Sequence, residues 1–300
     1  MIATNRREFL MASAAAALLG GAAVTAAEQK KPKLRLAVKY SMIGIEGTPK
    51  EKLAAIKKIG FEGVEIDSPS SLKIEDLAAA SKDAGVPIHG VIDSVHWQDT
   101  LSSADEKVRA KGLKALEGAL RDAKVVGADT VLLVPGVVNK DVTYAQCWDR
   151  STAEVKKALP LAKELKVKIA IETVWNNFIT EPKQLVDYVD QFESEWVGAY
   201  FDISNMVKYG VAPADWIRKL GKRMLKFDFK GYNWDKAKKA KDDWKGFDVK
   251  IGEGTEDWPE VLKALGEIGY DGWATSEVAG GDAKWLTEVF ERMQQVLGLK

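Results

Sequence analysis

Cysteine and histidine are scarce in this 300-residue sequence, which contains Cys147, His89 and His96 and no others. A single cysteine forms no internal disulfide, and it cannot build a zinc site from several thiolates. Two imidazoles exclude any mechanism or metal cluster that requires several histidines. Cys147 falls in a stretch with helical periodicity and His89 lies early in a predicted strand, so we expect Cys147 to be inert and His89 to be structural.

The sequence also lacks an excess of charge of either sign. Lysine and arginine total 44, aspartate and glutamate total 44, and the formal net charge is zero. A protein that binds nucleic acid through the phosphate backbone usually carries a basic excess, so the composition argues against this class. We interpret the basic run at residues 236–241 as a solvated loop rather than as a nucleic-acid patch.

The first 27 residues have the pattern of an export signal. The pair Arg6-Arg7 begins it, an apolar run rich in alanine and leucine follows at residues 11–23, and small residues precede the expected cleavage point. The arginine pair resembles a twin-arginine signal, which predicts a periplasmic or otherwise exported protein. An uncleaved membrane anchor is the alternative. No later segment approaches the roughly 18 apolar residues of a spanning helix, so we expect no stable membrane insertion after the signal is removed.

Residues 34–297 alternate between short strand patterns and amphipathic helical patterns. The predicted strands are Leu34–Tyr40, Gly63–Ile66, Ile88–Ser94, Thr130–Val134, Lys168–Thr173, Gly198–Asp202, Leu225–Phe229 and Trp273–Glu277. The predicted helices are Pro49–Ile59, Ile74–Ala84, Ala104–Val126, Ala153–Leu165, Pro182–Glu193, Pro213–Gly221, Trp258–Ile268 and Ala283–Leu297. This order predicts one domain of the α/β class, a closed parallel (β/α)8 barrel. An open doubly wound sheet is the alternative, but no Gly-x-Gly-x-x-Gly motif follows the first strand.

An acidic residue is the last or the next-to-last residue of each of the last four predicted strands. These residues are Glu172, Asp202, Asp228 and Glu277. Barrel active sites form at the carboxyl ends of strands, and these strands are neighbours, so we expect the four side chains to converge. Four carboxylates at such short distances would repel one another strongly, and a bound divalent cation removes this electrostatic cost. Oxygen-only ligands favour hard cations, so the sequence predicts a metal site with Mn²⁺ or Mg²⁺ as its cofactor. Glu65, on the second strand, is either a further ligand or a structural ion-pair partner.

The segments around these residues resemble the xylose isomerase-like TIM barrel superfamily, especially its sugar phosphate isomerase/epimerase branch. The resemblance extends over residues 34–297, and it is carried by residues 171–177, 201–205, 252–258 and 269–277. It implies that Glu172 and Glu277 bind the metal and also act as the acid and base, moving protons at a carbon next to a carbonyl, and that Asp202 is a further ligand. It also allows a homodimer, although no residue pattern marks an interface.

Two positions depart from the pattern of this superfamily. Asp228 stands where a histidine is usual on the seventh strand, and Asn205 stands where a histidine that contacts substrate is common. Asp228 can still bind a cation, although its added negative charge would weaken that cation as a Lewis acid. Asn205 can hydrogen-bond a substrate hydroxyl but cannot shuttle protons.

Other side chains near the strand ends are candidates for binding a sugar. His96 and Trp97 follow the third strand, Trp175 follows the fifth, and Lys230 lies two residues beyond Asp228. His96 contacts either substrate hydroxyls or the rim of the barrel, and Lys230 neutralises either an enediolate or a neighbouring acid. Tryptophan is abundant, with ten residues, and indole faces can stack on sugar rings, although most tryptophans pack in cores and rims.

The paired glutamates and the resemblance predict a metal-dependent isomerase or epimerase of a small carbohydrate, either a sugar or a keto-sugar. Export favours a free sugar or an oxidised glycoside over a phosphorylated substrate. A 3-keto-glycoside lyase that uses the same proton abstraction is one alternative. A non-catalytic sugar-binding barrel is another, motivated by Asp228 and Asn205. An abasic-site nuclease shares the superfamily but needs a His-rich cluster and a basic groove, so we expect no nucleic-acid partner.

Overall fold

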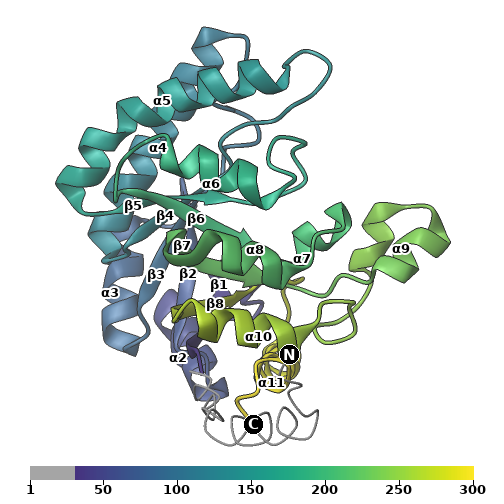
Figure 1. Ribbon diagram of the computed structural model, residues 1–300. Helices are drawn as coiled ribbons and strands as arrows, with labels where there is room; N and C mark the ends of the chain where they lie inside the picture. The colour runs from purple at the N-terminus through teal and green to yellow at the C-terminus, as the bar shows by residue number, and fades with distance from the viewer. Residues whose placement is uncertain (1–30) are drawn as a thin grey trace, which may run out of the picture. The chain divides into compact units, whose positions relative to one another are not determined.

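Eight parallel strands close into a barrel in the computed structural model, which describes residues 31–300 (Figure 1). The strands follow chain order around the barrel, and pairing of the first with the last closes it, from Lys33↔Asp271 to Val38↔Ser276. The strands are β1 (Lys33–Lys39), β2 (Gly63–Ser68), β3 (Ile88–Asp93), β4 (Thr130–Leu133), β5 (Lys168–Glu172), β6 (Val197–Asp202), β7 (Met224–Phe229) and β8 (Asp271–Ser276). The predicted barrel is therefore confirmed, while the predicted signal at residues 1–27 lies outside the described residues.

Helices surround the barrel, and most of them cover the outer faces of the strands, whereas α9 lies away from the strands (Figure 1). They are α2 (Pro49–Ile59), α3 (Ile74–Ala84), α4 (Glu106–Val126), α5 (Tyr144–Leu165), α6 (Pro182–Asp190), α7 (Ile203–Met206), α8 (Pro213–Leu220), α9 (Trp234–Ala240), α10 (Trp258–Glu267) and α11 (Ala283–Val296). Within residues 31–300, no helix combines the length and the apolarity that crossing a membrane requires.

Local sequence signals explain where the helices begin and end. Thr48 and Glu51 form a reciprocal capping box at the start of α2, with Pro49 at its first position. Gly85 and Gly127 end α3 and α4 in the left-handed conformation, where glycine carries no steric cost. These signals place the predicted bounds of α2 and α3 at the observed residues.

Two predictions about helices were wrong. The helix expected over Ala153–Leu165 begins nine residues earlier, at Tyr144, because Thr143 and Gln146 form a capping box there. The basic run at residues 236–241, expected to be a loop, lies mostly in α9, which Asn233 caps by accepting a 2.9 Å hydrogen bond from the Lys236 amide. Charge patterning alone did not reveal this helix, because its lysines face solvent.

A large apolar core lies between the strands and the helices, and a small one lies inside the barrel. The inner cluster consists of Ile92, Leu132, Ala170 and Tyr200, on four consecutive strands. Ile92 and Leu132 also line a cavity at the carboxyl end of the barrel, so the inner cluster forms the floor of that cavity. Polar side chains line this cavity, and the candidate site lies there.

Candidate active site

Three of the four predicted metal ligands lie together at the carboxyl end of the barrel. Glu172 ends β5, Asp228 lies on β7 and Glu277 directly follows β8. Each offers one carboxylate oxygen, and these oxygens all lie within 4.8 Å of one another. Glu172 and Asp228 are buried, whereas the Glu277 side chain is 33% exposed. We call these three residues the carboxylate cluster.

Asp202, the fourth predicted ligand, ends β6 and lies beside the carboxylate cluster rather than in it. One of its oxygens caps α7 by accepting a 2.8 Å hydrogen bond from the Asn205 amide. The other oxygen accepts a 2.7 Å hydrogen bond from Lys230 Nζ. Its two oxygens are therefore already paired, and its role as a metal ligand remains a prediction.

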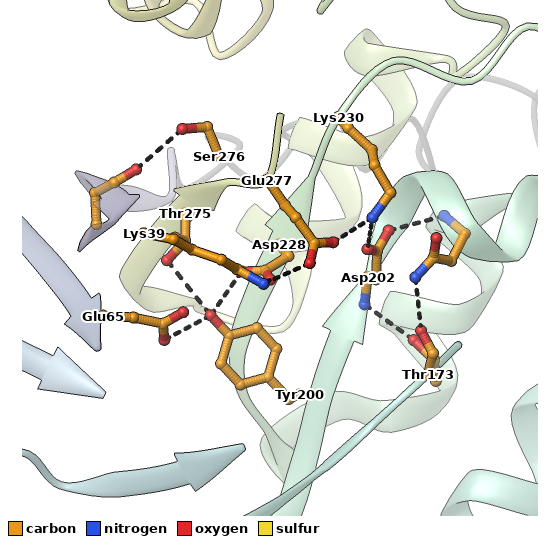
Figure 2. Close-up of polar contacts among 12 residues, drawn as sticks. Lys39, Glu65, Thr173, Tyr200, Asp202, Asp228, Lys230, Thr275, Ser276 and Glu277 are labelled. Carbon is orange, nitrogen blue, oxygen red and sulfur yellow. Dashed lines mark hydrogen bonds and ion pairs between the residues drawn. The ribbon is translucent and has the colours of Figure 1, made fainter. Parts of the chain in front are cut away.

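Two lysines, the buried Lys39 and the half-buried Lys230, neutralise part of the negative charge (Figure 2). Lys39 Nζ lies 2.6 Å from Glu277 Oε1 and 2.9 Å from Asp228 Oδ2. Lys230 bridges Asp202 and Glu277. Burial works to lower the pKa of both lysines, but the carboxylates around them outweigh burial and raise it, so both remain charged. Lys230 was predicted from its spacing beyond Asp228, while Lys39 was missed.

The two predicted acid/base glutamates have pKa values displaced in opposite directions. Burial works to raise the pKa of Glu277, yet the ammonium groups of Lys230 and Lys39 outweigh it and hold that pKa well below its usual range. Burial, reinforced by the charge of Glu277, raises the pKa of Glu172 well above its usual range. Pairs of carboxyl groups driven apart in this way are typical of sites where one group accepts a proton and the other donates one.

A buried polar network supports the cluster from below. The Tyr200 hydroxyl lies 2.7 Å from Asp228 Oδ1 and 2.8 Å from Glu65 Oε1 (Figure 2). Burial, with the nearby charge of Asp228, raises the pKa of Glu65 to about 8. His89 lies 3.6 Å from Glu65 and stacks on Trp273, with ring centroids 4.3 Å apart. Glu65 and His89 thus belong to the barrel interior, below the cavity.

His96 is buried at the cavity wall and is poised as a neutral donor. Burial lowers its pKa to about 4, with a further contribution from Lys39. Its Nδ1 atom accepts a 3.3 Å hydrogen bond from the Val134 amide, so the neutral ring carries its proton on Nε2. This N–H can donate to a hydroxyl or carbonyl oxygen in the cavity.

The main cavity opens above the carboxylate cluster and has a volume of about 660 Å³. All of the predicted sugar-contacting side chains line it, namely His96, Trp97, Trp175, Asn205 and Lys230. Trp97 is 50% exposed. Trp175 is held by a 2.7 Å hydrogen bond from its Nε1 to the Asn205 carbonyl oxygen.

Two further aromatic residues at the cavity mouth were not predicted. Trp244 and Phe247 lie in the connection between β7 and β8, and their ring centroids lie 4.6 Å and 4.9 Å from that of Trp175. Trp244 is 67% exposed, an unusual degree for an indole. Such exposed flat faces beside a polar cavity suit the apolar face of a sugar ring.

The carboxylate cluster fits a hard divalent cation by its donor chemistry. All three groups offer oxygen, the donor that Mg²⁺ and Mn²⁺ prefer. Asp228 Oδ2 lies 2.9 Å from Lys39 Nζ, which is the one charged partner of Asp228 among the described residues. A cation at this position would share Asp228 and Glu277 with Lys39.

The chain matches known proteins over nearly all of the barrel. A family model described as xylose isomerase-like TIM barrel matches residues 53–296. L-ribulose-5-phosphate 3-epimerase UlaE of Salmonella paratyphi B is 25% identical over 239 residues, covering 74% of this chain and 79% of that protein. The crystal structure of 3-keto-D-glucoside 4-epimerase from E. coli superimposes with a TM-score of 0.73 at 15% identity, covering 88% of this chain and 100% of that one. The zinc-bound IolI protein superimposes with a TM-score of 0.71 at 17% identity, covering 88% and 98%.

Proposed function

The chain belongs to the xylose isomerase-like TIM barrel family, and from this premise we propose that it is a metal-dependent isomerase or epimerase of a sugar or keto-sugar. The observation that carries the proposal is the pair Glu172 and Glu277, which line one cavity at the carboxyl end of the barrel and lie together with Asp228. The relative UlaE is named an epimerase, which supports the same reaction class.

Proton transfer at the carbon next to a carbonyl is the proposed chemistry. Glu277, held ionised by two lysines, removes the proton, and Glu172 returns one to the same carbon or its neighbour. The ammonium of Lys39 and the Nε2–H of His96 stabilise the negative charge that develops on the substrate oxygens.

A divalent cation, Mn²⁺ or Mg²⁺, is part of the proposal. Glu172, Asp228 and Glu277 would hold it, with Asp202 beside them. When bound, it would polarise the substrate carbonyl and the adjacent hydroxyl. The zinc atom in IolI supports a metal in this family, and the oxygen-only donors of this chain favour a harder ion.

The proposed substrate is an unphosphorylated carbohydrate outside the cytoplasm, either a free sugar or an oxidised glycoside. Residues 1–27 would direct export through a twin-arginine route, which carries folded proteins and so suits a protein that acquires its metal before it leaves the cytoplasm. Phosphorylated sugars are mainly cytoplasmic, so export favours an unphosphorylated carbohydrate.

Deuterium exchange tests the proposal. The mature protein is incubated with Mn²⁺ in D₂O with D-fructose, D-allulose or D-tagatose, and incorporation at the carbon next to the carbonyl is followed by NMR. Glu277→Gln and Glu172→Gln should each lower the rate by about 100-fold or more. Glu154→Gln is the matched control, because Glu154 is also buried and ion-paired but lies outside the cavity. Saturable ketose binding without any deuterium exchange would overturn the proposal that the protein is an enzyme and would favour a non-catalytic sugar-binding barrel.

The 3-keto-glycoside lyase is a second candidate, because the E. coli structural neighbour is named for a 3-keto-glucoside. In this reaction the base removes the proton next to the ketone, the glycosidic C–O bond breaks, and the departing oxygen takes a proton. Release of the free alcohol from a 3-keto-glycoside, in place of an isomer, would identify the lyase.

A further inference from the structure

A second cavity, of about 580 Å³, adjoins the main one at the carboxyl end of the barrel. The two cavities share Lys230, Phe247 and Glu277 in their walls. The ion pair between Lys230 and Glu277 therefore lies at their common boundary. A ligand longer than one ring that reaches Glu277 has room on both sides of this boundary.

The walls of the second cavity combine an aromatic face with hydrogen-bonding groups. Trp285 projects from α11, and its indole is fixed by a 2.8 Å hydrogen bond from Nε1 to the Ala279 carbonyl oxygen. Lys250 Nζ lies 5.4 Å from the centre of the Trp285 ring, and Asp248 and Glu253 add carboxylates. An indole beside charged side chains is a typical surface for a sugar, because the ring face packs on the indole and the hydroxyls bond to the charges.

The charges of the second cavity argue against a phosphate group. Its titratable lining consists of the two lysines Lys230 and Lys250 and the three acids Asp248, Glu253 and Glu277. Both lysines are already paired, Lys250 with Glu288 at 2.7 Å and Lys230 with Asp202 at 2.7 Å. A phosphate would therefore have to compete with an existing ion pair for either lysine, whereas a neutral polyol would find both donors and acceptors.

We propose that the second cavity binds the second unit of a two-unit saccharide, whose reacting unit lies in the main cavity over the carboxylate cluster. The proposal rests on the proposed function and names its substrate class, a keto-disaccharide or a keto-glycoside rather than a single sugar. The linkage between the two units would cross the Lys230–Glu277 ion pair, close to the proposed base.

The test compares ketose disaccharides with a ketose monosaccharide. Lactulose and maltulose are the two-unit probes, D-fructose is the one-unit probe, and kcat/KM and calorimetric affinity are measured for each. Ala279→Trp fills the second cavity without deleting a contact, because the Ala279 side chain is exposed at its wall. Trp285→Ala removes the indole. Matched controls are Ala283→Trp and Trp234→Ala, at positions that line neither cavity.

Wild type should prefer at least one disaccharide over D-fructose, and both cavity variants should lower that preference by about 10-fold, the effect of roughly 1.4 kcal/mol of binding free energy. The controls should leave the preference unchanged. Equal use of D-fructose and the disaccharides, with no change in Ala279→Trp, would overturn the second cavity as a binding site while leaving the epimerase intact. Failure to bind or convert any of the probes would overturn both.

Discussion

The Tyr200 hydroxyl lies 2.7 Å from Asp228 Oδ1, beneath the carboxylate cluster. The same hydroxyl lies 2.8 Å from Glu65 Oε1. A phenol has one hydrogen to donate, so the second contact requires a proton on a carboxyl group, and Glu65, whose pKa burial raises to about 8, carries it. Glu65 therefore donates to Tyr200, Tyr200 donates to Asp228, and the other oxygen of Asp228 faces Lys39.

Removing this hydroxyl should weaken both the barrel and the cluster. Tyr200→Phe leaves Asp228 and Glu65 without a shared partner, so we expect the free energy of unfolding to fall by about 1–3 kcal/mol. Urea denaturation measures the change. The control is Tyr232→Phe, because the Tyr232 hydroxyl is buried and has no hydrogen-bond partner among the described residues. Equal effects of the two substitutions would contradict the network.

The protonated state of Glu65 predicts a pH dependence of stability. Its pKa is about 8 in the folded protein against an ordinary value of 4.5, so the folded state retains a proton that the unfolded chain releases between these pH values. This contribution is fully present below pH 4.5 and is lost as the pH rises toward 8.

Glu65→Gln should remove this slope. Between pH 5 and pH 8 the unfolding free energy of the wild type should fall more steeply than that of the variant, by up to about 1.4 kcal/mol per pH unit. Chemical denaturation at four or five pH values measures both slopes. Parallel curves would show that Glu65 is ionised throughout this range.

Lys39 should compete with a divalent cation for the carboxylate cluster. Its ammonium contacts Asp228 and Glu277, two of the three groups that would hold the metal. Lys39→Met removes this charge, so we expect Mn²⁺ to bind about 10-fold more tightly or better, measured by calorimetry. Lys39→Arg keeps the charge and should show no such gain. Weaker binding in Lys39→Met would mean that the lysine supports the metal instead.

The barrel and the strand-end acids could be predicted because they depend on local pattern. Strand periodicity and chain order were enough to predict that Glu172, Asp228 and Glu277 lie together, without knowledge of which strands pair. Lys39 was not predicted, because a lysine at the end of an apolar strand is usually exposed to solvent. Only the pairing of β1 with β8, which closes the barrel, places Lys39 beside Glu277.

The second cavity and its indole depend on packing that sequence pattern does not encode. Trp285 lies in a helix whose periodicity predicts which side packs on the barrel but not which cavity a side chain lines. Phe247 lies in a connection without a repeating pattern. Their relation to Glu277 arises because the β7–β8 connection and the start of α11 meet at one end of the barrel.

Mn²⁺ binding to the carboxylate cluster is the most direct test of the account. Equilibrium dialysis of the metal-stripped mature protein is performed for wild type, Glu172→Gln, Asp228→Asn and the control Glu154→Gln. The account predicts one Mn²⁺ per chain in wild type and control, and binding weaker by about 10-fold or more in the two cluster variants. The absence of stoichiometric binding in the wild type, or equal binding in all four proteins, would contradict a metal at this cluster.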